Sequence, residues 1–136
     1  MINCVFLGGT TCETDWRSTV QSNLQQSIKS FNPIVEDWTE DCIENEKHMK
    51  REICNIHLYV ITSEMKGVYS IAEAVESVHM SNKTTILHIV PDGFSDGELR
   101  SLKATCDIIH SHGGIAYVDG DLNRSIRVIN YSFGEF

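Results

Sequence analysis

The segment Tyr69-Ser70-Ile71-Ala72-Glu73 contains the side chain best suited to chemistry in this sequence, the carboxylate of Glu73. It follows an apolar run at residues 56–62, typical of a buried strand, and begins a stretch with helical periodicity. A carboxylate on the first turn of such a helix can be a nucleophile or a base, because ligands of open α/β sheets bind in that region. The spacing of Ser70 and Glu73 is also that of a capping box, in which the glutamate folds back onto the serine amide. The two interpretations exclude each other in part.

Gly8-Gly9-Thr10 is the second candidate segment, and it follows the apolar run at residues 2–7. Two glycines allow backbone N–H groups to approach a ligand closely, and a following helix can offer its positive end to a phosphate. The segment matches neither the GxGxxG fingerprint nor a Walker loop. A ligand-binding loop and an ordinary tight turn therefore both remain open.

Asp37 and two tryptophans are further candidates. Asp37 follows a predicted short strand at residues 34–35, where its carboxylate is a functional group, a solvated loop acid or a helix cap. Trp16 and Trp38 each follow a predicted strand, and each either closes the core or stacks on a planar base. The acidic run at residues 40–46 precedes a basic one, and this order matches the helix dipole without requiring any function.

Strand-like and helical stretches alternate along the chain, which predicts a single domain over residues 1–136. Short connections indicate a parallel sheet covered on both faces, in a flavodoxin- or Rossmann-like three-layer α/β sandwich. Its switch point is expected next to the first strand, so that Gly8-Gly9-Thr10 and Glu73 face one crevice. The predicted strands are 2–7, 34–35, 56–62, 84–90 and 115–118. The predicted helices run from Thr14 or Asp15 to about Lys29, from 40 to 53, from Ser70 onward and from Ser95 to near His112. The pattern at residues 125–131 fits either a strand or a helix.

The composition excludes several kinds of partner. The 136 residues carry a formal net charge of -8, and no cluster of lysine and arginine forms a stripe, so a polymeric nucleic acid is not expected. The five cysteines show no CxxC spacing, which argues against a zinc site and favours reduced thiols in the cytoplasm. No run approaches the roughly 20 apolar residues of a membrane span, and the apolar start is too short for a signal peptide. We expect no metal, no cofactor and no membrane partner.

Five segments resemble the nucleoside 2-deoxyribosyltransferase-like proteins, most closely their small, less characterised branch. The segments are Cys4 to Thr10, Asp15-Trp16-Arg17, Pro33 to Trp38, Leu58 to Thr62 and Tyr69 to Glu73, spread over roughly residues 3 to 90. The resemblance implies a flavodoxin-like fold with five parallel strands. It also implies that Glu73 attacks C1′ of a nucleoside and displaces the base, forming a glycosyl-enzyme that water or a second base resolves, as in a retaining glycosidase.

The resemblance is incomplete at the group that protonates the leaving base. The family's aspartate six residues before the nucleophile is replaced by Gly67. Asp37 is the first candidate for the missing acid, and Glu64 is the second. Family members also complete the site with a polar residue of a neighbouring subunit, so the resemblance implies a homodimer or higher homo-oligomer, with Asn123 or Asn130 in this role.

The sequence thus predicts an enzyme that cleaves or transfers the N-glycosidic bond of a small nucleoside or nucleotide, with Glu73 and Asp37 as catalytic residues. The alternative is a non-catalytic nucleotide-binding or sensing module with the same pocket. The sugar or a 5′ phosphate is expected along Gly8, Gly9 and Thr10. The residues expected around the rest of the pocket are Trp16, Asp37, Trp38, Tyr69 and Ser70.

Overall fold

The computed structural model describes residues 2–11, 15–34 and 39–135, and this part of the chain forms one sheet of five parallel strands. The strands are β1 (Asn3–Gly9), β2 (Ile28–Phe31), β3 (Ile56–Ile61), β4 (Thr84–Ile89) and β5 (Ile115–Val118), in the spatial order β2-β1-β3-β4-β5. β1 pairs with β2 on one side and with β3 on the other. This order is flavodoxin-like and places the switch point beside β1, as predicted.

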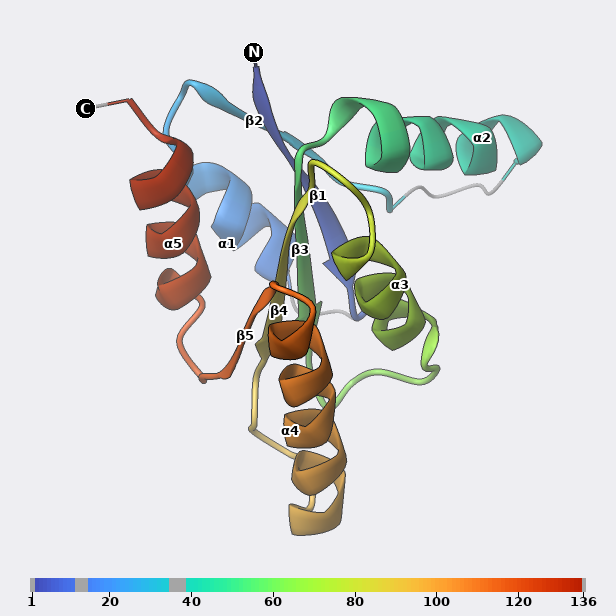
Figure 1. Cartoon of the computed structure of the whole chain (residues 1–136), viewed down its shortest axis with the longest axis vertical. Helices are drawn as coiled ribbons and strands as arrows, with labels where there is room; N and C mark the ends of the chain where they lie inside the picture. The colour runs from blue at the N-terminus through green and yellow to red at the C-terminus, as the bar shows by residue number, and fades with distance from the viewer. Residues whose placement is uncertain (1, 12–14, 35–38, 136) are drawn as a thin grey trace.

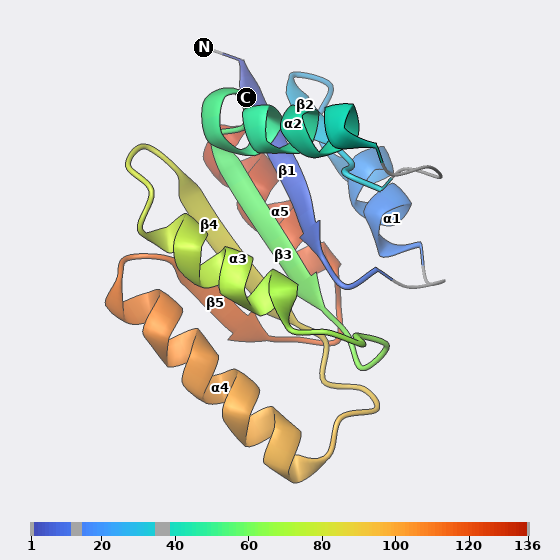
Figure 2. The same ribbon diagram turned by 90° about the vertical axis from the view of Figure 1, so that its right-hand side faces the viewer.

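Helices cover both faces of the sheet, which confirms the predicted three-layer α/β architecture. α1 (Trp16–Asn23) and α5 (Asn123–Phe133) lie on one side (Figure 1). α2 (Glu40–His48), α3 (Tyr69–Val78) and α4 (Asp96–Ser111) lie on the other side, which faces the viewer in Figure 2. A short π-helix, η1 (Met49–Ile53), continues α2 toward β3. Within the described ranges, no helix combines the length and apolarity needed to cross a membrane.

Two apolar cores result from this layering, one on each face of the sheet. Successive residues of a strand point to opposite faces, so Phe6 packs on the side of α3 and α4 and Leu7 on the side of α1 and α5. Every residue of β3 is buried, as expected for a central parallel strand. The apolar face predicted for the third helix packs into the first of these cores, through Ile71, Ala74, Val75 and Val78.

The region between β1 and α2 differs most from the prediction. The sequence pattern predicts a helix through Lys29, whereas α1 ends at Asn23. It also predicts a strand at residues 34–35, whereas β2 is Ile28–Phe31 and Ile34 lies outside any strand. The predicted end of the helix is therefore wrong, and the strand prediction is wrong at Ile34, while Val35 lies outside the described residues.

A side chain from α5 explains the early end of α1. The amide oxygen of Asn130 accepts a hydrogen bond from the N–H of Gln25 at 2.9 Å, and its Nδ2 donates to the carbonyl of Asn23 at 3.0 Å. Asn130 thus binds backbone groups that are left over at a helix end. The chain is released as a strand, and Ile28 enters the core instead of a helix face.

The remaining elements agree closely with the prediction. Thr39 caps α2 by accepting a hydrogen bond from the N–H of Cys42, and Ser95 and Glu98 form a capping box at the start of α4. The predicted fifth strand at residues 115–118 matches β5. The carboxyl-terminal segment, which the pattern left undecided, is the helix α5.

Candidate active site

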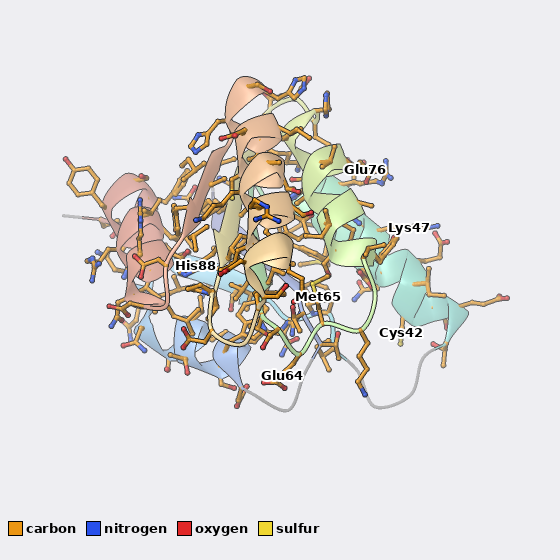
Figure 3. The ribbon with its side chains drawn as sticks, turned by 90° about the horizontal axis from the view of Figure 1, so that it is seen from below. Cys42, Lys47, Glu64, Met65, Glu76 and His88 are labelled. Atoms are coloured by element: carbon orange, nitrogen blue, oxygen red, sulfur yellow. The ribbon has the colours of Figure 1, made fainter. Side chains whose placement is uncertain are left out.

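A cavity of about 830 Å³ opens at the carboxyl edge of the sheet. The carboxyl ends of the strands point toward the bottom of Figure 1, and Figure 3 views the molecule from that side. Most of its lining comes from the end of β1, the segment from Met65 into α3, and one side of α2 and η1, and the rest includes Arg17 of α1, Pro33, Ile34 and Ile61. The lining residues used below are Phe6, Gly8, Gly9, Thr10, Arg17, Glu46, Lys50, Gly67, Tyr69, Ser70 and Glu73. The expected crevice is therefore present, with Glu73 and the Gly-Gly segment in one cavity.

Glu73 is a buried carboxylate that pairs with a buried ammonium. The Nζ of Lys50 lies 2.7 Å from Oε2 of Glu73, and the two side chains keep only 6% and 8% of their surface exposed. Lys50 comes from η1 and Glu73 from α3, so the ion pair joins two elements across the cavity wall. A buried charge is tolerated when an opposite charge and hydrogen bonds compensate its lost hydration. Lys50 provides this compensation for Glu73.

The capping-box interpretation of Ser70 and Glu73 is not realised. α3 begins at Tyr69 with Val68 as its N-cap, and the N–H groups of Ile71 and Ala72 both donate to the carbonyl of Val68. Because the helix starts before Ser70, the serine lies inside the first turn. Glu73 is then beyond the position from which a side chain can reach back to an N-cap amide. The carboxylate is directed to Lys50 instead.

Gly8 and Gly9 belong to the last part of β1, and β3 packs so closely against them that neither position can carry a side chain. A Cβ on Gly8 would lie 2.5 Å from the ring of Tyr59. Gly9 has a φ of +116°, and a Cβ there would lie 2.2 Å from the carbonyl oxygen of Val60. Both glycines also line the cavity, so the closely packed backbone forms part of its wall. Because Gly8 and Gly9 are strand residues, the tight-turn interpretation is wrong for them, and ligand binding by this segment stays a prediction.

Thr10 ties the segment after β1 to the segment after β3. Its N–H donates to the carbonyl of Val60 at 2.8 Å, and its Oγ1 accepts from the N–H of Thr62 at 2.9 Å. The Thr10 amide is therefore used by the fold and is not offered to a ligand. The contribution of Gly8, Gly9 and Thr10 to the cavity is its shape.

Trp16 and Arg17, at the start of α1, hold this segment through hydrogen bonds to its backbone carbonyls. Trp16 is 2% exposed, belongs to the core on the α1 and α5 side, and donates from Nε1 to the carbonyl of Thr10 at 3.1 Å. Trp16 is absent from the cavity lining. Arg17 is buried beside it, with its guanidinium carbon 4.3 Å from the centroid of the Trp16 ring, and it donates to the carbonyls of Leu7, Gly9 and Thr10. Arg17 itself lines the cavity, and the sequence interpretation did not single it out.

Glu46 brings a second carboxylate to the cavity, from α2. Burial raises the pKa of Glu46 above its ordinary value, and the negative charge of Glu73 raises it further, while Lys50 and Arg17 oppose the increase. The site therefore holds one carboxylate paired with an ammonium and a second one whose pKa is raised above its ordinary value. Such a difference between neighbouring carboxyl groups is the usual basis for dividing acid and nucleophile roles.

His57, a buried residue of β3, holds η1 in place by a hydrogen bond to its backbone. Its Nε2 lies 2.7 Å from the carbonyl oxygen of Lys50, and its Nδ1 lies 2.7 Å from Oγ of Ser77 in α3. A carbonyl only accepts, so Nε2 carries the proton and Nδ1 accepts from Ser77, which in turn accepts from Thr85. Burial lowers the pKa of His57 to about 4, in keeping with a neutral ring. The backbones that carry Lys50 and Glu73 are thus linked through one histidine.

The other predicted site residues have different outcomes. Asp37 and Trp38 lie outside the described residues. Tyr69 lines the cavity with 71% of its surface exposed, and Ser70 lines it as well. Glu64 is exposed and absent from the cavity lining; Figure 3 shows it on the loop after β3, apart from α2 with its labelled Cys42 and Lys47. Asn130, a candidate for completing a neighbouring site, instead holds the end of α1 within its own chain.

Glu46 and Lys50, like Arg17, are cavity residues that the sequence interpretation missed. They are four positions apart, a spacing that places two side chains on one face of a helix. The pattern of acids followed by bases in this helix was attributed to the helix dipole, and Glu40, Asp41, Lys47 and His48 do lie at the matching ends of α2. The spacing of Glu46 and Lys50 was the available signal, but only the fold shows that this face of the helix lines the cavity.

A family model described as nucleoside 2-deoxyribosyltransferase like matches residues 3–94 of the chain. The match runs from the start of β1 to the loop before α4, and it includes every residue named above as lining the cavity. No curated protein and no solved structure matches the chain.

Proposed function

The chain belongs to the nucleoside 2-deoxyribosyltransferase-like family, and we propose that it breaks the N-glycosidic bond of a nucleoside or nucleotide, with Glu73 as the nucleophile. The placement of Glu73 carries this proposal. It is a buried carboxylate in the wall of a large cavity at the switch point, and it is paired with Lys50 rather than with its own helix end. A carboxylate used only as a cap has no need of a buried counter-ion or of a cavity.

The reaction proceeds in two displacements. An oxygen of the Glu73 carboxylate attacks C1′ of the sugar, and the electron pair of the breaking C–N bond goes to the base. The transition state resembles an oxocarbenium ion, which the nearby carboxylate stabilises electrostatically. Water or a second base then attacks C1′ of the glycosyl ester and releases Glu73. Hydrolysis and transfer differ only in which of these two acceptors reaches the ester.

Glu46 supplies the proton that the leaving base takes up. It lines the same cavity from α2, its charge interacts with that of Glu73, and its raised pKa favours the protonated form. After the first step, its carboxylate accepts a proton from the incoming water or base, so the acid is regenerated. Asp37, the acid expected from the sequence, remains a prediction.

The rim of the cavity suits a planar base above a sugar. Tyr69 exposes its ring at the cavity, where an aromatic face can stack on a base. Gly8 and Gly9 present no side chain, which leaves room for a ribose against the end of β1. Ser70 lies near Glu73 on the same turn of α3 and can bond a sugar hydroxyl.

Replacement of the nucleophile tests the proposal. Glu73→Ala is expected to lower base release from the best substrate of a nucleoside and nucleotide panel by ~10³-fold or more, since no ester can form. Glu76→Ala is the matched control, because Glu76 is on the same helix, half exposed, and pairs only with Arg51 at 3.5 Å among the described residues. Incubation with a 2-fluoro-2-deoxyribosyl nucleoside should add the mass of the sugar to the wild type and not to Glu73→Ala. Wild-type rates in Glu73→Ala would refute the proposal.

A non-catalytic nucleotide-binding module is the second candidate, and Gly67 is the observation that favours it. The family places an aspartate at this position, whereas Gly67 lines the cavity, and a Cβ added there would have nothing within 4 Å among the described residues. The module predicts a thermal shift with nucleotides but neither a sugar adduct nor base release. Base release from the nucleoside and nucleotide panel, which includes both ribosides and 2′-deoxyribosides, therefore separates the two functions, and a sugar adduct supports the enzyme.

A further inference from the structure

The ammonium of Lys50 has hydrogen-bonding capacity that the described part of the protein does not use. One of its N–H groups donates to Oε2 of Glu73 at 2.7 Å, and no other described residue accepts from it. The ring of Phe6 lies on another side, 5.8 Å from Nζ to its centroid. A lysine ammonium carries about three donors. Because Lys50 is buried and lines the cavity, a ligand in the cavity can accept hydrogen bonds from its remaining donors.

The backbone around Lys50 keeps this ammonium in place. The carbonyl of Lys50 accepts the hydrogen bond of His57 at 2.7 Å, and the N–H of Cys54 donates to the carbonyl of Met49 at 2.7 Å within the π-helical turn. π-Helical turns occur often at functional sites, where they redirect a side chain. Lys50 therefore presents its donors to the cavity from a fixed position beside the nucleophile.

The position of Lys50 determines which part of a sugar it meets. In a β-nucleoside the base leaves from one face of the furanose ring, so the nucleophile must attack C1′ from the opposite face. The 2′-hydroxyl of ribose projects from that opposite face, on the carbon next to C1′. A 2′-deoxy sugar has only hydrogen there, and an arabinose sugar has its 2′-hydroxyl on the face of the base. A donor that touches the attacking carboxylate therefore adjoins the 2′ position.

We propose that Lys50 donates a hydrogen bond to the 2′-hydroxyl of the sugar, and that the substrates of this protein are ribosides rather than 2′-deoxyribosides. This inference rests on the proposed function, since the attack of Glu73 orients the sugar. A 2′-deoxy sugar would leave the buried N–H donors of Lys50 without an acceptor. Sites built to bond a substrate hydroxyl reject the analogue that lacks it far more strongly than sites that sense only its size.

Matched substrates test this preference in the wild-type protein. Ribonucleosides and their 5′-monophosphates are compared, base by base, with the 2′-deoxy and arabino forms, by kcat/KM for base release and by Kd from calorimetry. The riboside is expected to be favoured by ~100-fold or more in kcat/KM over both other forms. The arabinoside carries the same hydroxyl on the wrong face, so it separates hydrogen bonding by Lys50 from a general tolerance of hydroxyl groups.

Substitution of Lys50 tests the assignment to this residue. Lys50→Met is expected to lower activity on all sugars, because Glu73 loses its counter-ion, but also to reduce the ribo-to-deoxy ratio to within ~5-fold of unity. Lys50→Arg keeps the charge with different donor positions and should retain more activity with an altered ratio. Lys103→Met, an exposed position on α4, is the matched control and should leave the ratio unchanged. If Lys50→Met does not fold, the ratio in Lys50→Arg decides.

The outcomes distinguish this inference from the proposed function. A wild-type preference for 2′-deoxyribosides, equal use of ribo and arabino sugars, or an unchanged ratio in both Lys50 variants would each overturn the role of Lys50. If the wild type releases no base from any sugar, the proposed function fails, and the Kd values then decide on Lys50. Tighter binding of ribosides that disappears in Lys50→Met would support the inference for a binding module, and equal Kd values would overturn it.

Discussion

At the scale of single residues, the ion pair between Glu73 and Lys50 connects an ambiguous sequence motif to a chemical role. Ser70 and Glu73 have the spacing of a capping box, yet Val68 takes the N-cap position and Glu73 turns to Lys50. A buried carboxylate that pairs with an ammonium beside a cavity is suited to nucleophilic attack, because it lies close to where a sugar can bind. The second carboxylate, Glu46, differs from Glu73 in having no ammonium of its own at hydrogen-bonding distance among the described residues.

The role of Glu46 leads to a prediction about leaving groups. Glu46→Gln should lower kcat for ordinary purine nucleosides by ~100-fold or more, because the base must then leave without a proton. It should have little effect on a purine nucleoside methylated at N7, whose base departs without protonation. The alkaline fall of the wild-type kcat profile, caused by ionisation of the Glu46 acid, should also disappear. Rates of base release across pH, corrected for spontaneous depurination, provide the measurement.

Glu44→Gln is the control for this prediction, since Glu44 is on the same helix with 76% of its side chain exposed. Equal losses on ordinary and N7-methylated substrates would show that Glu46 acts through binding or structure. If the same selective loss followed Asp37→Asn instead, the acid would be the one that the sequence pattern first indicated.

At the scale of elements, the end of β1 combines a structural and a functional requirement. Gly8 and Gly9 pair with Tyr59 and Val60 of β3 so closely that neither position has space for a side chain. The same two residues form a wall of the cavity. Close packing of the two central strands at the switch point thus also creates the space in which a ligand can lie.

A pair of glycine substitutions tests this argument. Gly9→Ala should lower the free energy of unfolding by about 3 kcal/mol or more, because it adds a clash with the Val60 carbonyl to an unfavourable φ. Gly67→Ala is the matched control in the same cavity, since no described atom lies within 4 Å of the Cβ it would add, and it should change stability by less than about 1 kcal/mol. Urea denaturation of both variants provides the comparison. Similar values for the two would mean that β1 and β3 can separate at little cost.

At the scale of the whole molecule, the two sides of the sheet have different tasks. Asn130 of α5 is hydrogen-bonded to the backbone at the end of α1, and Trp16 packs in the core between these helices and the sheet. The opposite side carries the charged groups of the cavity on α2, η1 and α3. His57, on β3, connects η1 to α3 through Lys50 and Ser77, so the charged groups depend on a buried polar network.

This network makes stability depend on pH. The pKa of His57 is lowered from 6.5 to about 4 by burial, so the unfolded chain binds a proton more readily than the folded one between these values. Stability is therefore retained above pH 6.5 and is lost as the pH falls toward 4, by an upper bound of about 3 kcal/mol from this residue. His57→Gln, which keeps one donor and one acceptor, should show a shallower loss in urea denaturation series over this range. Parallel curves for the wild type and the variant would contradict this expectation.

The sequence by itself determined the elements that depend on local patterns and on the order of the chain. Periodicity and strand-helix alternation predict the parallel three-layer fold, the switch point beside β1 and the approximate limits of β3, β4 and β5. They also predict that Glu73, Gly8 and Gly9 line one cavity. These features could be predicted because hydrophobic spacing is a property of neighbouring residues.

Only the tertiary structure decided the features that join distant residues. Asn130 ends α1 across 105 positions, which no local pattern reports. Lys50 draws Glu73 away from its helix end, and the inward turn of α2 makes Glu46 a neighbour of both. In each case a local preference for helix or cap competes with a contact that exists only after folding. Burial strengthens these polar contacts, because inside the protein an unpaired charge or amide has no water to replace its partner.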